Sequence, residues 1–311
     1  MTPTASVPAG LRRQVPLSSM TSLKVGGPAD LFGTAHGAAE ARDLLRWALA
    51  EGLPCRWVGG GSNLLVADGG AEGLVARYVA DRVELPTGSS GEVVAEAGRS
   101  FPNLARALAR AGWGGLEWAA NVPGTVGGAV ANNAGAFGSS VAETLRWAEL
   151  LLPTGETERL PAAELGYAYR TSRLKRGELG PAVVLAAAFA VRPAPPSEAT
   201  ALVKRLQAQR TATQPRQLSA GSVFANPPGD YAGRLIEAAG MKGRRWGQAE
   251  ISRRHANFIV NLGGAAAADV YALIRLAQVS VWERFGVWLP PEIEPFGRWS
   301  AAQRTALVQP A

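Results

Sequence analysis

The spacing of apolar residues predicts a mixture of helices and strands in the first half of the chain. Residues Ala38–Glu51 carry apolar side chains three and four positions apart, the pattern of a helix with one buried face, and Gly52 follows as a stop signal. A second helix is expected to begin after Ser100, which can cap it, and to end at Gly112. The face of the first helix comprises Ala41, Leu44, Leu45, Ala48 and Leu49.

Short apolar runs between these helices predict strands. Trp147–Leu152 and Glu156–Leu160 flank a Pro-Thr-Gly turn and predict a hairpin. Ala182–Val191 is the longest apolar run and is typical of a buried strand, because it is about half the length that a membrane-spanning helix needs. The other predicted strands are Arg56–Val58, Leu64–Val66, Leu74–Val79 and Glu92–Ala97.

The proline-rich stretch Arg192–Pro196 interrupts both periodicities and predicts a domain boundary. The residues from Arg298 onward show no strong pattern, and we expect that tail to be loose. Strands and helices mix without a regular strand-helix-strand repeat, so the fold class expected is α+β. Beyond the boundary we predict helices over Ser197–Arg210, Tyr231–Ala239 (capped by Asp230) and Ala268–Phe285, and a strand over His255–Asn261.

Composition places the chain among globular proteins. With 311 residues, 47% hydrophobic and 18% charged, it is long enough for two domains. The single cysteine, Cys55, excludes an intrachain disulfide and favours a reducing cytoplasm. The segment Met1–Ser19 has no apolar core, so no secretory signal is expected, and the whole pattern predicts a soluble cytoplasmic protein without a membrane association.

The charge balance narrows the class of ligand. Lys and Arg number 32 against 25 Asp and Glu, a formal net charge of +7. That surplus suits an anionic ligand, and it also suits nucleic acid or a membrane surface. The basic residues are scattered and form no five-residue block, so nucleic-acid binding is not expected.

Two glycine-rich segments are candidate ligand loops. Gly59-Gly60-Gly61-Ser62-Asn63 matches neither the dinucleotide fingerprint nor the Walker motif, yet consecutive glycines expose backbone N–H groups that can form an anion-binding nest. Pro123-Gly124-Thr125-Val126-Gly127-Gly128 repeats the device, and Asn132-Asn133-Ala134-Gly135 adds small polar groups. For each loop alone, a tight turn is the favoured explanation. Their presence on one domain favours a ligand with two phosphates and a wide flat ring.

Other polar residues suggest chemistry less specifically. Ser222 lies outside any nucleophile-elbow pattern and is otherwise a loop serine, whereas Glu292 follows two prolines that fix its backbone. Arg170 beside Tyr169 is suited to gripping a carboxylate or phosphate, although a surface ion pair is the simpler interpretation. His36 and His255 have no cysteine at metal-ligand spacing, so no metal site is expected.

Taken together, these segments resemble the flavin-dependent UDP-N-acetylenolpyruvoylglucosamine reductases of peptidoglycan synthesis. Within that family, the chain resembles the shorter subclass, which lacks a tyrosine-bearing insertion. The matching segments occur in the order of the family and cover Leu17 to Gly297. They are Thr21–Asp30, Gly59–Val66, Asn121–Gly138, Tyr169–Ser172, Ala220–Pro227, His255–Asn261 and Pro291–Gly297.

The resemblance implies a fold with one domain that binds the cofactor and another that binds the substrate. An FAD-binding domain of the vanillyl-alcohol-oxidase type is expected over residues 17–192, in two subdomains split near 70–80, with a smaller α+β substrate domain over 197–297 and a tail over 298–311. The resemblance implies Ser222 as proton donor, Arg170 and Glu292 as further catalytic residues, and Asn226 and Tyr169 as substrate contacts. The implied FAD contacts are Gly59, Gly60, Gly61, Ser62, Asn63, Asn121, Pro123, Gly124, Thr125, Gly127, Gly128, Asn133 and Gly135.

The implied reaction is the NADPH-dependent reduction of UDP-N-acetylglucosamine-enolpyruvate to UDP-N-acetylmuramate, with tightly bound FAD and no obligate protein partner. Ala225 and Glu294 depart from residues common in the family, which bears on substrate affinity and not on the reaction. Two alternatives stay open at this point. One is a flavin oxidase of the same fold superfamily that uses oxygen, and the other is a non-catalytic nucleotide- or nucleic-acid-binding protein.

Overall fold

The computed structural model describes residues 7–87 and 91–309, which fall into two compact units. The first unit holds the described residues up to Arg13, together with Leu31–Gly60 and Gly73–Arg210. The second holds Gln14–Asp30, Gly61–Glu72 and the described residues from Thr211 onward. The division therefore passes through the first glycine loop, between Gly60 and Gly61. The assignment of residues 17–192 to cofactor and 197–297 to substrate stays a prediction.

A five-stranded antiparallel sheet lies in the core of the first unit. Its central strand, β13 (Val183–Ala190), is apolar throughout and mostly buried, as expected from the longest apolar run. The predicted hairpin is confirmed, because β11 (Leu145–Leu151) pairs with β12 (Thr157–Pro161). The strand order is β12-β11-β13-β7-β6, with β7 at Glu92–Glu96 and β6 at Val83–Glu84.

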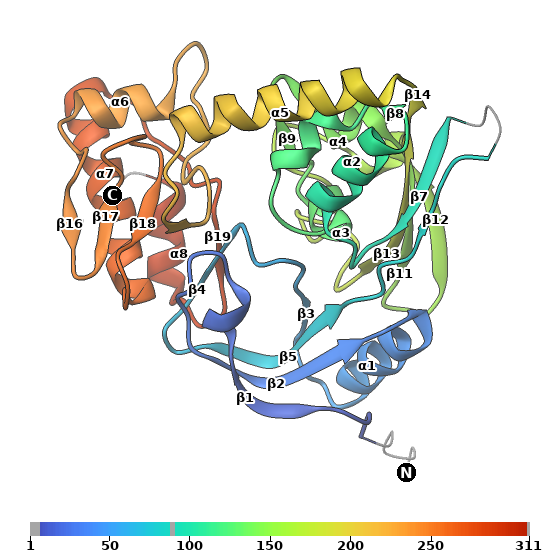
Figure 1. Cartoon of the computed structure of the whole chain (residues 1–311). Coiled ribbons are helices and arrows are strands. Elements are labelled where there is room, and N and C mark those ends of the chain that lie inside the picture. The colour runs from blue at the N-terminus through green and yellow to red at the C-terminus, as the bar shows by residue number, and fades with distance from the viewer. Residues whose placement is uncertain (1–6, 88–90, 310–311) are drawn as a thin grey trace. The chain divides into compact units, whose positions relative to one another are not determined.

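Helices cover this sheet and its neighbour. Figure 1 shows α2 (Phe101–Arg110) and α3 (Val126–Ala131) beside the five-stranded sheet. A four-stranded sheet has the order β1-β2-β5-β3, and its strands are β1 (Arg12–Pro16), β2 (Pro28–Ala35), β5 (Ala71–Tyr78) and β3 (Cys55–Trp57).

The helix α1 (Ala38–Ala50) confirms the first predicted helix and most of its buried face. A side chain at Gly33 of β2 would lie 2.7 Å from a methyl group of Leu44, so the strand and the helix are in close contact. The prediction that Leu49 lies on the same buried face is wrong, because Leu49 is 42% exposed. Trp47 is buried instead.

The second unit has its own sheet and core. Its sheet order is β15-β18-β17-β16, and α7 (Ala267–Phe285) supplies the buried residues Val270, Leu273 and Ile274. The predicted strand over His255–Asn261 is confined to β18 (Ile259–Asn261), because a turn precedes it, closed by the Phe258 N–H donating to His255 O at 3.0 Å. The other strands are β15 (Leu218–Ser219), β17 (Ala249–Ile251) and β16 (Arg245–Trp246), and a separate parallel pair joins β4 (Leu64–Val66) to β19 (Glu294–Phe296).

The tail of the chain departs from the expectation of a loose segment. Residues Ala301–Val308 form α8, with Ser300 Oγ accepting the Gln303 N–H at 3.1 Å and Leu307 buried. The predicted cap at Asp230 is also wrong in detail, since α6 (Ala232–Ala238) has Tyr231 at its N-cap. The remaining elements are η1 (Leu17–Met20), β8 (Trp113–Gly114), η2 (Glu117–Asn121), β9 (Gly135–Ala136), β10 (Ser139–Ser140), α4 (Val141–Thr144), η3 (Ala162–Leu165), β14 (Arg192–Pro193) and α5 (Pro196–Thr213).

Candidate functional site

The two glycine loops are packed against each other within the first unit. A Cβ atom at Gly59 would lie 2.5 Å from Thr125 Oγ1, and one at Gly60 would lie 2.8 Å from Gly124 Cα. No side chain fits at either position without displacing the other loop. Gly59 and Gly60 were predicted to bind a cofactor. The structure shows that glycine is needed at both positions because the two loops approach each other closely there.

The second loop uses several of its backbone donors internally. The Gly127 N–H donates to Ala97 O at 2.9 Å, and the Gly128 N–H donates to Thr125 Oγ1 at 3.3 Å. Val126 N–H donates to Arg99 O at 2.8 Å. These N–H groups already have acceptors within the protein, so a ligand contact by Gly127 or Gly128 would use other atoms. The anion-binding nest expected from the sequence therefore has fewer available N–H donors in this loop.

Two asparagine side chains of the same region carry buried polar atoms that have no protein partner among the described residues. They are Asn121 Nδ2 and Asn132 Oδ1. Leaving such a group unpaired costs about 1–3 kcal/mol, so a polar ligand at this place would offset that cost. Asn132 Nδ2 donates to Gly128 O at 3.0 Å, which fixes its amide. Asn132 lies in the Asn-Asn motif noted in the sequence, but only its unpaired Oδ1 in the structure marks it, and not Asn133, as a candidate ligand contact.

Asn133, predicted to contact the cofactor, has both ends of its amide in use. Its Nδ2 donates to Ala168 O at 2.9 Å, and its Oδ1 accepts the Ala142 N–H at 2.9 Å. The residue is buried with a φ of 43°. Its observed role is to connect three segments of the chain. A cofactor contact by Asn133 stays a prediction, and it would involve atoms other than those in these two bonds.

Arg170 occupies a tight turn in a conformation unusual for its residue type. Ala168 and Thr171 close the turn through two reciprocal backbone hydrogen bonds of 3.2 Å, and Arg170 has a φ of 55°. The left-handed region costs a non-glycine residue about 1–2 kcal/mol. The guanidinium Nη2 donates to Gly135 O at 2.7 Å, and Cζ lies 5.4 Å from the centroid of the Tyr169 ring. Strain of this kind at a cationic side chain is typical of functional sites.

Tyr169, the other central residue of this turn, is 61% exposed. Its neighbour Tyr167 is turned inward, where its hydroxyl donates to Val130 O at 3.1 Å. Burial raises the pKa of Tyr167 far above its usual value, so this hydroxyl keeps its proton and remains a donor at physiological pH.

Within the second unit, the backbone joins Ser222 and Glu292. The Glu292 N–H donates to Val223 O at 2.7 Å, next to Ser222, and the Val223 N–H donates to Asn257 O at 2.9 Å. Asn257 also exchanges two hydrogen bonds of 2.9 Å with the backbone of Phe224. The two predicted catalytic residues are therefore carried by segments that are hydrogen-bonded neighbours, although they are far apart in sequence.

The first glycine loop continues into this second unit. Asn63 Nδ2 donates to Glu292 O at 3.0 Å, and the Glu294 N–H donates to Asn63 O at 2.9 Å. Gly61 O accepts the Ser22 N–H at 3.1 Å. The bonds of Asn63 fasten the segment that carries Glu292, and a cofactor contact by Asn63 stays a prediction.

Asn226 is exposed, and its Oδ1 accepts the Ala232 N–H at 3.1 Å at the start of α6. Its Nδ2 is the atom through which the predicted substrate contact would be made.

His255, by contrast, is tied into the structure. The Asn257 N–H donates to its Nδ1 at 3.2 Å, which requires the neutral ring, and burial together with Lys242 lowers its pKa.

Two further observations bear on the class of site. Across residues 7–87 and 91–309, no group of three or more His, Cys, Asp and Glu side chains is placed to hold a metal ion. In the same part of the chain, no helix combines the length and the apolar character that crossing a bilayer requires.

Comparison with known proteins agrees with this arrangement. Residues 29–161 match the model of an FAD-binding domain, and residues 214–296 match the UDP-N-acetylenolpyruvoylglucosamine reductase C-terminal domain. These matches confirm the predicted α+β fold with an FAD-binding domain and a smaller C-terminal domain. The two models name the cofactor and the enzyme class that the sequence motifs suggested.

Similar full-length proteins carry the same name. A UDP-N-acetylenolpyruvoylglucosamine reductase from Chloroflexus aggregans is 49% identical over 93% of this chain and 98% of its own length. One from Synechococcus sp. strain RCC307 is 46% identical over 95% of this chain and 97% of its own. The crystal structure of the enzyme from Thermus caldophilus has a TM-score of 0.78 at 36% identity and covers 92% of this chain and 99% of that one. The chain therefore belongs to the UDP-N-acetylenolpyruvoylglucosamine reductase family, whose members are FAD-dependent oxidoreductases.

Proposed function

We propose that this chain reduces the enolpyruvyl group of UDP-N-acetylglucosamine-enolpyruvate to give UDP-N-acetylmuramate, with NADPH as reductant. This is the reaction of the family in peptidoglycan synthesis. The observation that carries the proposal is the 49% identity with a reductase over 93% of the chain. A single-domain match would suggest the cofactor alone, whereas this similarity includes both the FAD-binding and the C-terminal domains.

The residues of the first unit fit FAD. Asn121 Nδ2 and Asn132 Oδ1 offer a donor and an acceptor that lack protein partners among the described residues, and the close packing at Gly59 and Gly60 brings the two glycine loops together in the same unit. When bound, FAD supplies the hydride-transfer chemistry. The protein contributes position and electrostatic field, and we assign the buried atoms Asn121 Nδ2 and Asn132 Oδ1 to orienting the cofactor.

Arg170 is assigned to the carboxylate of the enolpyruvyl group. Reduction of the double bond places negative charge on this carboxylate as an enolate, and a fixed guanidinium stabilises that charge. The hydrogen bond from Arg170 Nη2 to Gly135 O, at 2.7 Å, holds the cation in one orientation. Preorganisation of this kind reduces the rearrangement required as the charge develops.

Ser222 is assigned to protonation of the neighbouring carbon, and Glu292 to the relay that supplies Ser222 or polarises the enol ether. A serine hydroxyl is a weak acid, so it depends on neighbouring groups to deliver a proton. The hydrogen bond of 2.7 Å between the Glu292 N–H and Val223 O supports the pairing, because it joins the two segments next to both side chains.

The substrate class is a small UDP-sugar, for which the net charge of +7 is suited. We assign Tyr169 and Asn226 to substrate contacts, and we place the reaction in the cytoplasm, where a chain with one cysteine needs no disulfide. No protein partner, nucleic acid or membrane is required by this scheme.

The test separates the two half-reactions under anaerobic conditions. The purified, desalted protein should show flavin absorption, release FAD on denaturation, lose its flavin absorption on addition of NADPH and regain it on addition of the enolpyruvyl substrate. In a parallel aerobic assay, flavin reduction by an alcohol and reoxidation by oxygen, with no reoxidation by the enolpyruvyl substrate, would establish a flavin oxidase instead. A colourless protein that fails to take up added FAD would contradict the proposal altogether.

A further inference from the structure

The turn that carries Arg170 is fastened on both sides to the segment Val130–Gly135. Before the turn, Asn133 Nδ2 donates to Ala168 O at 2.9 Å. After the turn, Ser172 Oγ donates to Ala131 O at 2.6 Å. The guanidinium of Arg170 itself reaches Gly135 O, so three hydrogen bonds join a short turn to one stretch of the predicted cofactor loop.

We propose that Ser172 is a positioning residue for Arg170, acting by anchoring its turn to the end of α3. The inference rests on the proposed function, in that Arg170 is taken as the cation that stabilises the reacting carboxylate. Ser172 is completely buried, with 0% exposure, and therefore cannot contact solvent-borne substrate itself. It acts through Arg170.

The acceptor of the Ser172 bond explains why a hydroxyl is needed there. α3 ends at Ala131, and the last four carbonyl groups of a helix have no partner within it. Ser172 satisfies the carbonyl of Ala131 from outside the helix, as Tyr167 does for the carbonyl of Val130. Replacing Ser172 with alanine leaves a helix-terminal carbonyl without this donor and releases the turn from the helix.

Ser172 also sets the position of a second group that contacts Arg170. Its Oγ accepts the Lys175 N–H at 3.2 Å, which starts a turn that folds the chain back. The ammonium group of Lys175 then donates to Arg170 O at 3.0 Å. One hydroxyl thus holds the turn against α3 and places the cation that holds the left-handed backbone of Arg170.

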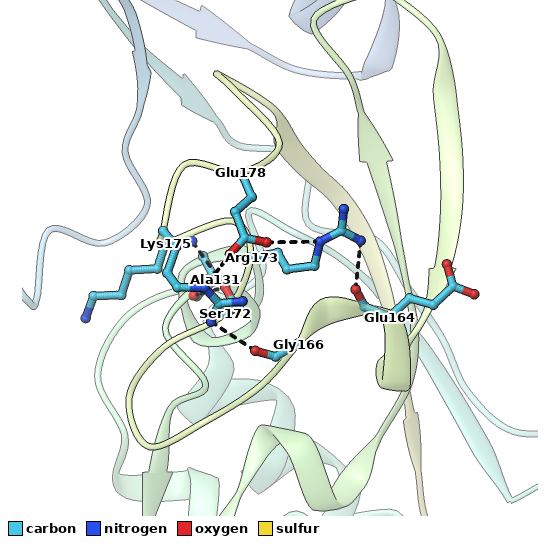
Figure 2. Close-up of polar contacts among 8 residues, drawn as sticks. Ala131, Glu164, Gly166, Ser172, Arg173, Lys175 and Glu178 are labelled. Carbon is cyan, nitrogen blue, oxygen red and sulfur yellow. Dashed lines mark hydrogen bonds and ion pairs between the residues drawn. The ribbon is translucent and has the colours of Figure 1, made fainter.

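The ion pairs that surround this turn are less able to hold it. Figure 2 shows Arg173 bonded to Glu178 and to the carbonyl of Glu164. Arg176 also pairs with Glu178, at 2.6 Å, and its hydrogen bond lowers the pKa of that carboxylate. These side chains are between 36% and 45% exposed, and exposed ion pairs contribute little to stability. The buried hydroxyl is the stronger candidate for fixing the turn.

The test uses the FAD-loaded enzyme and the variant Ser172→Ala. We expect flavin reduction by NADPH to stay within about twofold of wild type and reoxidation by the enolpyruvyl substrate to fall about tenfold to a hundredfold, as for a misplaced reacting group. In an Arg170→Ala background, Ser172→Ala should cause no further loss, because the two residues act as one. Thr200→Ala is the matched control, since it removes a hydroxyl that bonds to the Pro196 carbonyl in α5.

Losses that add independently in the double variant would overturn the proposal, as would equal losses in both half-reactions. If Ser172→Ala fails to fold, Lys175→Met removes the ammonium group that donates to Arg170 O and should give the same selective loss. Normal reoxidation in that variant would contradict the mechanism.

An NMR measurement that does not depend on catalysis tests the positioning role of Ser172 independently of the proposed reaction. The Arg170 Nε–Hε resonance, assigned by its loss in Arg170→Lys, should become more mobile in Ser172→Ala. An unchanged order parameter would refute positioning by Ser172, even in a protein that proves to catalyse another reaction.

Discussion

The turn at Arg170 and the loop at Ser222 hold their functional side chains by different means. At Ser222, the left-handed geometry falls on Gly221, whose φ is 80°. The backbone groups of this loop bond to the backbone of Asn257 and Glu292 and to the side-chain amide of Asn257. At Arg170, the functional residue itself adopts the left-handed conformation, and side chains from Asn133, Ser172 and Lys175 hold it there.

This contrast shows where each site is vulnerable. A loop fixed by backbone bonds tolerates changes of its side chains but depends on the glycine that permits its geometry. A turn fixed by side chains tolerates little around it, because each contact compensates part of the backbone strain. The two regions should therefore respond in opposite ways to substitutions of side chains and of glycine.

The largest effect is expected for Ser222→Ala. Loss of a general acid should slow reoxidation of the flavin by the enolpyruvyl substrate by about 10² to 10⁴, while reduction by NADPH stays nearly intact. Stopped-flow absorbance of each half-reaction measures this, with Ser219→Ala as the control because it lies in β15 outside the proposed machinery. Equal slowing of both half-reactions would remove Ser222 from the role of proton donor.

Arg170→Ala is expected to slow the same half-reaction by about 10² to 10³, the range for removal of one preorganised charge-stabilising donor. Arg170→Lys keeps the charge but loses the planar group that reaches Gly135, so it should recover only part of the rate. The rate of flavin reoxidation at saturating substrate is the measurement. A fully active Arg170→Ala enzyme would exclude the residue from the mechanism.

Stability measurements sharpen the comparison further. Gly221→Ala should lower the free energy of unfolding by about 1–2 kcal/mol, because alanine is disfavoured at a φ of 80°. Arg170→Gly relieves the corresponding strain in the other turn, so it should unfold at an equal or higher urea concentration while losing activity. Urea denaturation of both variants and wild type tests this opposition. Two variants that are destabilised alike would show that the two regions are held in the same way.

The smallest effect expected is a pH dependence of stability that arises from His255. This residue accepts the N–H of Asn257, which in turn bonds to the Ser222 loop. The pKa of His255 is lowered by burial and by Lys242, with Glu237 acting in the opposite direction, so the folded protein binds a proton less readily than the unfolded chain. Its contribution to stability is complete above the ordinary histidine pKa of about 6.5 and is lost as the pH falls below it. The urea midpoint should therefore decrease between pH 7.5 and 5.5. His255→Gln should reduce this decrease.

The sequence predicted the regular elements well because their signals are local. The helices α1 and α7 and the β11–β12 hairpin follow from apolar spacing and turn residues over short windows. The helix α8 was missed, although Ser300 and Gln303 form a capping-box pattern that was present in the sequence. Its apolar face amounts to one buried residue, Leu307, and carries little periodic signal.

The site was predicted as a set of motifs but not as a set of contacts. The glycine-rich loops indicated candidate segments, and their contact with the cofactor stays a prediction. The hydrogen-bond partners of each donor depend on residues far away in sequence. Asn133 was expected to face the cofactor, and its amide bonds to Ala168 and Ala142. Asn132 and Ser172 were not singled out, because a buried acceptor or a helix-terminal carbonyl becomes visible only after the chain is folded.

The second unit consists of pieces from the start, the early middle and the end of the chain. Asn261 donates to the carbonyl of Leu23 at 3.0 Å, and Trp299 donates to that of Leu65 at 3.0 Å. During synthesis on the ribosome, residues near Leu23 and Leu65 must wait for partners made more than two hundred residues later. A fragment that begins after Leu65 would lack these two partners. The core of this unit, which includes Leu23, Leu65 and Leu307, is complete only after α8 has been synthesised.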